Sequence, residues 1–412
     1  MGSIIFNNFI FSFPKNILIP YSSKYSKRNF DFNSYKINFN DQSYSSIRLN
    51  RPIDTVLMIN NQCVTDCIYC YADKQNSTSC KIPFSRLKEI ILEAKELGMR
   101  NFDIYGGELF LYERWYDLLK LLYENDFEPY ISTKVPLKRD DIKKLKELNI
   151  KGIQISIDSI DEKELLLNLN RNTKYKESII STLYLLEEYE IPFYTNTVIT
   201  RFNSNIVSIS NLVSFLVQFK YIRRIGLTAA GYSLYKSEAD FQNYKASIKD
   251  LDAINAYIED IKLKHLDIKI FMGSHLIKAD IISDIVDTKV KEQKFKNRAS
   301  CTGNIENFYI LPDGKVTICE ELYWNPKFLI GDLMKNSILE VWHSSQAQYI
   351  YNLNQEHISE NSACRNCEEF KNCRTYPGVC WKMVLYAYGE DNWDFPDPRC
   401  FKANAPEKVF YM

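Results

Sequence analysis

The chain has 412 residues, of which 45% are hydrophobic and 25% are charged, a composition typical of a folded protein of two or three domains. Lys and Arg together number 52, as do Asp and Glu, so the net charge is zero and binding of nucleic acid through overall charge is disfavoured. No apolar run of about eighteen residues predicts a membrane span, and residues 1–20 lack the pattern of a signal peptide. We therefore expect a cytoplasmic protein, in which thiols stay reduced.

Short apolar and β-branched runs alternate with segments of helical periodicity along the chain. Strands are predicted at residues 55–60, 101–105, 128–133, 152–157, 193–200 and 224–228, with a further one at 266–271. Helices are predicted at residues 85–97, 115–122, 139–148, 162–189, 206–217 and 244–264, and Gly98 is the expected stop of the first. This alternation predicts an α/β fold, a partial (β/α)6 barrel of parallel strands. Ligands of such sheets bind at the carboxyl ends of the strands.

The eleven cysteines fall into two groups, four within residues 63–80 and seven within residues 301–400. Their odd number fits a disulfide framework poorly. Their distribution predicts a barrel over residues 53–285 and a cysteine-rich domain over residues 286–412. A basic, aromatic-rich N-terminal extension over residues 1–52 precedes them.

The first cysteine group contains the spacing C-x3-C-x2-C, formed by Cys63, Cys67 and Cys70. Three thiolates on one tight loop can hold three irons of a 4Fe-4S cluster and leave the fourth iron open. Zinc is the alternative, but zinc sites favour four ligands and C-x2-C pairs. Cys80 lies ten residues further on, and we interpret it as a reduced thiol outside this set.

This motif and the barrel that follows resemble the radical S-adenosylmethionine (SAM) enzymes. In that family the open iron of the cluster chelates the amino and carboxylate groups of SAM. Gly106-Gly107-Glu108, after the second strand, is similar to the family's motif for the amino group. Bare backbone at the glycines lets the ligand approach closely, and a carboxylate suits an ammonium. Tyr69 is similar to an aromatic residue that packs near the adenine. Lys134 stands where the family often has an asparagine.

The resemblance implies further SAM contacts at the ends of later strands. Ser132 and Thr133 match positions that face the cofactor, and Ser156 and Asp158 match a strand end that faces the ribose. Arg171 resembles an arginine that pairs with the cofactor carboxylate, and its alternative interpretation is a solvated helix residue.

The second cysteine group begins with a predicted hairpin at residues 308–319, which turns at Pro-Asp-Gly. Together with the later cysteines it resembles the SPASM domain of peptide and protein maturases, which implies two auxiliary 4Fe-4S clusters and three clusters in all. The first auxiliary cluster is assigned to Cys301, Cys319 and Cys380. The second is assigned to Cys364, Cys367, Cys373 and Cys400. Zinc knuckles are the structural alternative.

Two features depart from the SPASM pattern. Six residues separate Cys373 from Cys380, more than is usual, which questions the role of Cys380. No cysteine lies between Asp287 and Ser300, where some relatives supply a fourth ligand. We therefore hypothesise an open iron site on the first auxiliary cluster.

The N-terminal extension carries seven Lys or Arg residues against two Asp residues, a local charge of +5. One hypothesis is a basic surface that attracts an acidic leader peptide. The alternative is a layer of strands, for example within residues 4–13, packed on the barrel with solvated lysines.

The resemblance implies reductive cleavage of SAM to a 5′-deoxyadenosyl radical, which abstracts hydrogen from a substrate. We expect a maturase that installs a C–C, C–S or C–O crosslink in a ribosomally made precursor peptide. It would depend on a reductase, flavodoxin or ferredoxin as electron donor. The runner-up is an anaerobic sulfatase maturase that forms formylglycine, and the non-enzyme alternative is an iron–sulfur or zinc scaffold. No motif identifies a catalytic acid, base or hydrogen donor among the 28 tyrosines and other candidates.

Overall fold

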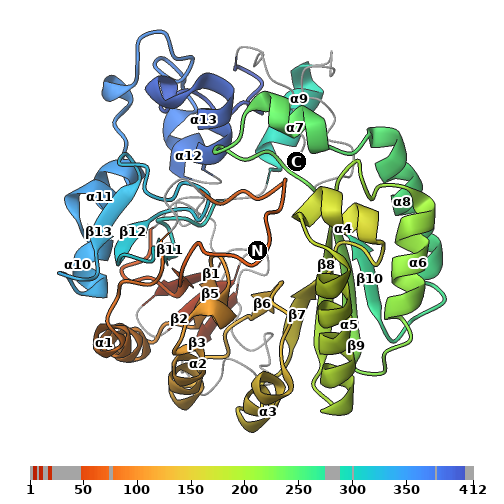
Figure 1. Ribbon diagram of the computed structural model, residues 1–412. Coiled ribbons are helices and arrows are strands. Elements are labelled where there is room, and N and C mark those ends of the chain that lie inside the picture. Colours follow the sequence, from red (N-terminus) through yellow and green to blue (C-terminus); the bar gives the residue numbers. More distant parts are fainter. Residues whose placement is uncertain are drawn as a thin grey trace. The chain divides into compact units, whose positions relative to one another are not determined.

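The computed structural model describes residues 3–6, 9–12, 17–20, 48–73, 78–273, 288–298, 301–375 and 378–403 (Figure 1). By backbone proximity the described residues form two units. One unit draws on residues 1–57, 81–102 and 282–409, and the other on residues 58–80 and 103–281. The domain boundaries predicted after residues 52 and 285 stay predictions.

The second unit contains a sheet of five parallel strands in the order β10-β9-β8-β7-β6. These strands are β6 (Ser132–Thr133), β7 (Ile153–Ser156), β8 (Phe193–Ile199), β9 (Ile222–Ala229) and β10 (Lys269–Met272). In β7 and β8 every second side chain is buried, as expected of strands that face a core. Because all five strands run in parallel, their carboxyl ends meet at one edge of the sheet.

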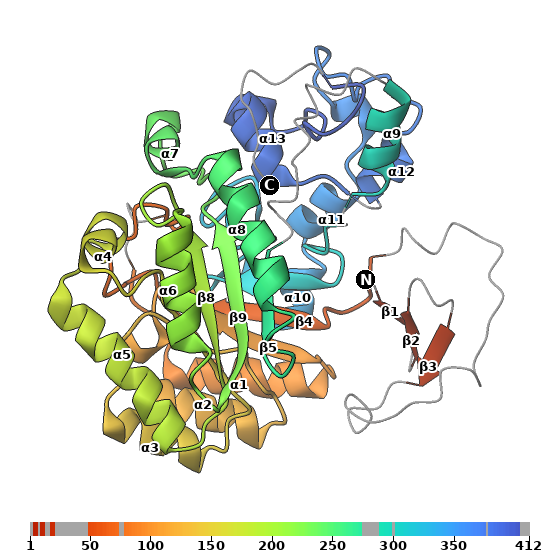
Figure 2. The same ribbon diagram turned by 90° about the vertical axis from the view of Figure 1, so that its right-hand side faces the viewer.

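Helices separate the strands of this unit and confirm the predicted α/β fold. They are α2 (Trp115–Glu124), α3 (Arg139–Glu147), α4 (Glu162–Leu169), α5 (Thr173–Glu188), α6 (Ile206–Leu216), α7 (Glu238–Tyr244) and α8 (Ile248–Ile261). Figure 2 shows α6 and α8 lying along the strands β8 and β9. The alternation of parallel strands and helices is consistent with a partial barrel.

The single helix predicted over residues 162–189 is wrong. Asn170 adopts a left-handed conformation, with φ of 53°, and ends α4. Asn172 then caps α5, because its side chain accepts a hydrogen bond from the backbone N–H of Tyr175. The apolar periodicity continues across this break, so periodicity alone does not reveal it.

The first unit is built on a sheet of order β13-β12-β11-β4-β5. Its strands are β4 (Asp54–Met58), β5 (Asn101–Tyr105), β11 (Asn307–Ile310), β12 (Lys315–Thr317) and β13 (Leu329–Asp332). The hairpin predicted at residues 308–319 is confirmed as β11 and β12, with Gly314 at a φ of 89° in the turn. β11 pairs in parallel with β4, so the cysteine-rich tail extends the sheet that contains β4 and β5. Both β4 and β5 run on into the second unit.

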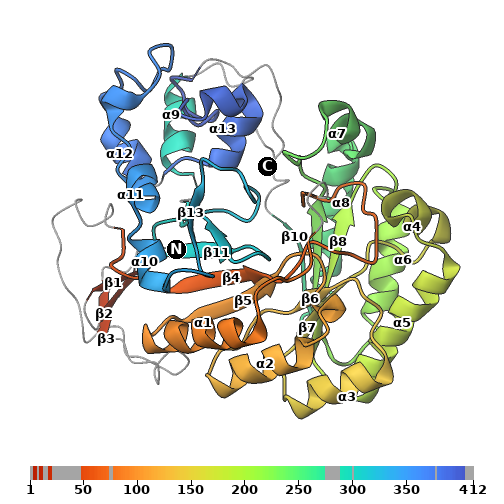
Figure 3. The same cartoon turned by 60° about the vertical axis from the view of Figure 1, so that its left-hand side comes forward.

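Helix α1 (Phe84–Glu96) belongs to the first unit and lies along this sheet in Figure 3. It buries the apolar face predicted for it, and Gly98 follows its end with a φ of 67°, as expected of a helix stop. The tail adds short helices, which are α9 (Thr288–Lys296), α10 (Ile338–Trp342), α11 (Ser345–Tyr351), α12 (Phe370–Thr375) and α13 (Trp381–Tyr388).

The N-terminal extension forms three short antiparallel strands, β1 (Ser3–Phe6), β2 (Phe9–Ser12) and β3 (Ile17–Pro20). Five of its seven cations, Lys15, Lys24, Lys27, Arg28 and Lys36, lie outside the described residues. Attraction of an acidic leader by this segment therefore stays a prediction.

One cation of the extension, Arg48, is buried rather than displayed on a surface. Its guanidinium donates to the backbone oxygen of Asn304 at 2.7 Å, to Oδ1 of the same residue at 2.8 Å and to the backbone oxygen of Trp342 at 2.6 Å. It also stacks 3.8 Å from the centre of the Trp342 ring. Burial lowers the pKa of Arg48 to about 10. Arg48 thus fastens the extension to the tail within the first unit.

Replacing this arginine should destabilise the first unit. Arg48→Met removes three hydrogen bonds and leaves two buried carbonyls and an amide oxygen without a donor, so we expect a loss of about 3 kcal/mol in the free energy of unfolding. Urea denaturation followed by circular dichroism measures this loss. Lys335→Met is the control, because Lys335 is 79% exposed and forms only a long ion pair with Asp332. Equal stability of the two variants would contradict the assigned role.

Candidate functional site

The first three cysteines share one loop that follows β4. The hydroxyl oxygen of Thr65 lies 3.3 Å from Sγ of Cys63 and 3.2 Å from Sγ of Cys67. Cys70 is close enough for its charge to raise the pKa of both other thiols. Burial is the larger effect and raises the pKa of Cys67 to about 11. The loop therefore brings together the three thiols predicted to bind a cluster.

The end of helix α4 fixes this loop. The backbone N–H groups of Asp66 and Ile68 donate to the carbonyl oxygens of Leu169 and Asn168, at 3.1 and 3.0 Å. Arg171 follows directly, and its Nε is buried with no hydrogen-bond partner among the described residues. A buried, unpartnered guanidinium N–H fits a carboxylate ligand. This is the role that the family resemblance implies for Arg171.

Glu108 places a carboxylate beside the same loop, and its side chain is buried. Oγ1 of Thr133 donates to its Oε2 at 2.6 Å, and the backbone N–H of Lys134 donates to its Oε1 at 2.9 Å. Its Oε1 lies 3.8 Å from Sγ of Cys63. Burial raises the pKa of Glu108, although these two donors oppose the effect. A fixed carboxylate next to the cysteine loop suits the ammonium group of SAM.

The two glycines before Glu108 let two backbone segments approach each other. A Cβ on Gly107 would lie 1.9 Å from the carbonyl oxygen of Gln62, and one on Gly106 would lie 2.3 Å from that of Asn60. Gly106 also has a φ of 113°, which side chains rarely adopt. The two glycines thus allow the backbone segment that leads into Cys63 to pack closely against residues 106 and 107.

A Gly107→Ala substitution should displace the cysteine loop, because the new methyl group meets backbone that cannot move aside. We expect the reconstituted variant to lose most of the iron bound at this loop, which a colorimetric iron assay measures. Gly231→Ala is a matched control in the same unit, since a Cβ there has no atom within 4 Å. Wild-type iron content in Gly107→Ala would show that the loop tolerates the contact.

A buried charge pair lies at the ends of β6 and β7. Nζ of Lys134 lies 3.0 Å from Oδ2 of Asp158, and both side chains are largely or fully buried. The hydroxyl of Tyr69 donates to the same carboxylate, and the backbone N–H of Val198 donates to its Oδ1 at 2.9 Å. Burial alone would lower the pKa of Lys134, but the nearby Asp158, Cys67 and Tyr175 together outweigh it and raise that pKa. Asp158 therefore holds Tyr69 and Lys134 beside the cysteine loop.

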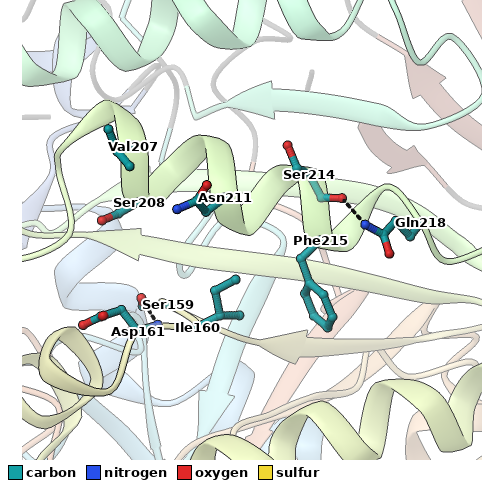
Figure 4. Close-up of a pocket in the computed structure, with 9 residues that line it drawn as sticks. All are labelled: Ser159, Ile160, Asp161, Val207, Ser208, Asn211, Ser214, Phe215 and Gln218. Atoms are coloured by element: carbon teal, nitrogen blue, oxygen red, sulfur yellow. Dashed lines mark hydrogen bonds between the residues drawn. The ribbon is translucent and has the colours of Figure 1, made fainter.

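The remaining predicted SAM contacts are Ser132 and Ser156. Both are partly buried at the carboxyl ends of β6 and β7, on the edge where Thr133 and Asp158 also lie. Figure 4 shows a separate hollow between residues 159–161 and helix α6, where the amide of Gln218 bonds the Ser214 carbonyl. None of the predicted cofactor residues lines this hollow.

Four of the tail cysteines line one small hollow in the first unit, namely Cys364, Cys367, Cys373 and Cys400. They are the set assigned to the second auxiliary cluster. Phe295, Phe370 and Val379 also line it, as do the charged residues Arg374, Asp397 and Lys402. Burial raises the pKa of Cys400 to about 11. Such a thiol-lined hollow suits an iron–sulfur cluster.

The other three tail cysteines lie near one another. Cys301 and Cys380 are close enough to Cys319 that, after burial, their charges raise its pKa further. The long spacing before Cys380 does not separate it from them. The backbone N–H of Gly378 donates to the Cys373 carbonyl at 3.1 Å, which brings the chain back toward Cys373. Cys380 then lies directly before α13.

None of the eleven cysteines, all of which are described, forms a disulfide. In the described part of the chain, no three Cys, His, Asp or Glu side chains converge on a point as ligands of a single metal ion. The cysteines of a 4Fe-4S cluster bind separate irons, so they do not have to converge in this way.

Sequence reasoning missed several charged side chains around the tail cysteines. Arg298, Arg374 and Lys402 each approach a different thiol of the second set. Nε and Nη1 of Arg374 are buried without a partner among the described residues, as expected of donors that face a cluster. A signal was present, because Arg374 directly follows Cys373 and Lys402 lies two residues after Cys400.

Comparison with known proteins matches two domains. The Radical SAM superfamily profile matches residues 57–207, and the SPASM iron–sulfur cluster-binding profile matches residues 301–368. No described helix is both long and apolar enough to span a membrane.

Two curated relatives show distant sequence similarity. An uncharacterised protein of Methanocaldococcus jannaschii is 25% identical over 268 residues, which are 61% of this chain and 88% of that protein. The sporulation killing factor maturation protein SkfB of Bacillus subtilis is 22% identical over 277 residues, which are 65% of this chain and 60% of SkfB.

The fold is similar to that of SuiB from Streptococcus suis. The crystal structure of SuiB matches with a TM-score of 0.65 and 17% identity, covering 96% of this chain and 99% of that one. SuiB bound to its precursor peptide SuiA matches with a TM-score of 0.63 and 19% identity, covering 90% and 84% of the two chains. The chain therefore contains a Radical SAM domain, matched over residues 57–207, and an iron–sulfur cluster-binding SPASM domain, matched over residues 301–368.

Proposed function

We propose that this protein is a maturase that installs a C–C, C–S or C–O crosslink in a ribosomally made precursor peptide. The observation that carries the proposal is the arrangement around the cysteine loop. The Glu108 carboxylate lies 3.8 Å from Sγ of Cys63, and the Nε of Arg171 follows the helix end that anchors the loop. Glu108 is thus available for the ammonium group of an amino acid ligand, and Arg171 for its carboxylate.

Each residue of this site has a defined task in the proposal. Cys63, Cys67 and Cys70 hold the cluster, and Glu108 and Arg171 orient the ammonium and carboxylate of SAM. Tyr69, held by Asp158, packs at the adenine side. When bound and reduced, this cluster and SAM supply a 5′-deoxyadenosyl radical, which takes a hydrogen atom from the peptide.

The count of three clusters is part of the proposal. Cys301, Cys319 and Cys380 would hold the first auxiliary cluster, with an open iron site. Cys364, Cys367, Cys373 and Cys400 would hold the second. Auxiliary clusters suit a net oxidation, because closing a crosslink removes two hydrogens and an electron must leave the substrate after the radical step.

A peptide substrate is supported by two of the similar proteins. SkfB is named for maturation of a killing factor, and SuiB was crystallised with its precursor peptide. The electron donor is proposed as a reductase, flavodoxin or ferredoxin, and the location as cytoplasmic.

The test is anaerobic reconstitution with iron and sulfide, followed by reduction with dithionite in the presence of SAM. We expect 5′-deoxyadenosine by liquid chromatography, and none from a variant in which Cys63, Cys67 and Cys70 are all replaced by Ala. If the wild-type protein forms no 5′-deoxyadenosine, the proposed enzyme activity is refuted.

A second measurement separates the peptide substrates. A short peptide encoded beside this protein should lose two hydrogens per crosslink in mass spectrometry. Conversion of a Cys or Ser to formylglycine in a sulfatase peptide would instead establish the runner-up, a sulfatase maturase.

A further inference from the structure

Three cationic side chains surround the thiols of the second tail set. Nη2 of Arg298 lies 3.3 Å from Sγ of Cys373, and Nη2 of Arg374 lies 3.4 Å from Sγ of Cys364. Nζ of Lys402 lies 3.9 Å from Sγ of Cys367. Three of the four thiols therefore each have a cationic donor of their own. We name these three side chains the cationic collar.

Among the described residues, no hydrogen bond or ion pair joins an Asp or Glu side chain to the collar. Asp397 lines the same hollow and its charge acts on Arg298, but its ion pair is with Arg399. Arg298 also donates to the carbonyl oxygens of Phe295 and Gly378. Arg374 donates to the carbonyl oxygens of Asp394 and Phe395. These partners are neutral backbone groups, so they orient the guanidinium groups and leave their charge in place.

The first tail set has a different electrostatic environment. Glu321 is the charged neighbour of Cys319, and its carboxylate pairs with Lys382. The nearest charges to Cys301 and Cys380 are Arg399 and Asp397, which form a buried ion pair at 2.7 Å. Each cation near these thiols is thus matched by a carboxylate.

Charge and N–H···S hydrogen bonds are among the factors that set the reduction potential of a cluster. Reduction adds one electron, so a neighbouring cation stabilises the reduced form more than the oxidised form. We propose that the cationic collar raises the reduction potential of the second auxiliary cluster above that of the first. The inference rests on the proposed binding of a cluster by Cys364, Cys367, Cys373 and Cys400.

This ordering assigns a task to each cluster. The cluster at Cys301, Cys319 and Cys380 has the lower potential, and the cluster inside the collar is the more favourable acceptor for a single electron. Arg298, Arg374 and Lys402 are positioning residues in this scheme, since they act through the cluster and not on the substrate.

The test uses the full-length protein with Cys63, Cys67 and Cys70 replaced by Ala, so that only auxiliary clusters remain. Iron and sulfide are counted after reconstitution, and a redox titration followed by electron paramagnetic resonance gives a midpoint potential for each cluster. Lys402→Gln, Arg374→Gln and Arg298→Gln should each lower the higher of the two potentials and leave the lower one unchanged.

Lys402→Glu is the sharpest variant, because Lys402 is exposed and its replacement should not impair folding. Reversing its charge should shift the reduction equilibrium on the order of tenfold, or about 59 mV for a one-electron couple. Arg86→Gln is the control, since Arg86 bonds the carbonyls of Leu333 and Asn336 and pairs with Glu89.

The two possible failures are distinct. The proposed effect of the collar on the potential would be overturned by either of two results in Lys402→Glu with full iron content. Both potentials could stay unchanged, or the lower potential alone could shift. Absence of iron from the starting protein would instead overturn the auxiliary clusters of the proposed function.

Discussion

A Glu108→Gln variant should bind SAM ten- to a hundredfold more weakly than the wild type and form correspondingly little 5′-deoxyadenosine. Both carboxylate oxygens accept hydrogen bonds, from Thr133 and from the backbone of Lys134. An amide replaces one of these acceptors with a donor, so the Thr133 hydroxyl has to change from donor to acceptor for both contacts to persist. The amide also carries no charge to attract an ammonium. A hydrogen bond to a charged group contributes roughly 1.5–3 kcal/mol, which gives the expected range.

The loss should be specific to SAM. Equilibrium dialysis measures its affinity, and the iron content of the same preparation shows whether the cluster is still bound. Glu124→Gln is the matched control, because Glu124 is 60% exposed at the end of α2. Unchanged SAM affinity with full iron content would exclude Glu108 from cofactor binding.

Local signals in the sequence predicted the elements that surround the site. The run of β-branched residues before Cys63, the stop at Gly98 and the turn at Gly314 each have a short-range cause, and the structure contains all three features. The break of the helix at Asn170 is also local. It was missed because apolar spacing on both sides continues the same pattern, whereas the left-handed residue itself leaves little trace in composition.

Gly106 and Gly107 have a packing role in the structure that the sequence did not indicate. The sequence suggests that bare backbone at Gly106 and Gly107 lets a ligand approach. In the structure, added Cβ atoms would first meet the backbone of Asn60 and Gln62, which leads into the cysteine loop. This contact joins residues more than forty positions apart, so no local pattern contains it.

The charged neighbours of the tail cysteines required the fold for the same reason. Arg298 reaches Cys373 across 75 positions of the chain. Arg374 adjoins Cys373 in sequence, yet its Nη2 lies near Cys364. Sequence proximity indicated that cations are abundant here, but only the fold assigns each one to a thiol.

Replacement of Lys134 tests how much the buried pair of Lys134 and Asp158 contributes to stability. It departs from the asparagine often found in the family, and the structure pairs it with Asp158 at 3.0 Å. Lys134→Met removes the cation and leaves a fully buried carboxylate, whose remaining donors among the described residues are Tyr69 and the Val198 N–H. Breaking a buried pair in this way costs about 3–5 kcal/mol in the free energy of unfolding.

A double substitution distinguishes this explanation from a general packing defect. Lys134→Met combined with Asp158→Asn removes both charges. The amide oxygen can still accept from the Val198 N–H, and the amide NH2 can donate to the Tyr69 hydroxyl oxygen. We therefore expect the double variant to recover most of the stability lost in Lys134→Met, as measured by urea denaturation of each variant. If the two losses simply add, the lysine acts through packing. Recovery would show that this chain replaces the amide often found at that position by a charge pair, so Lys134 and Asp158 have to be exchanged together.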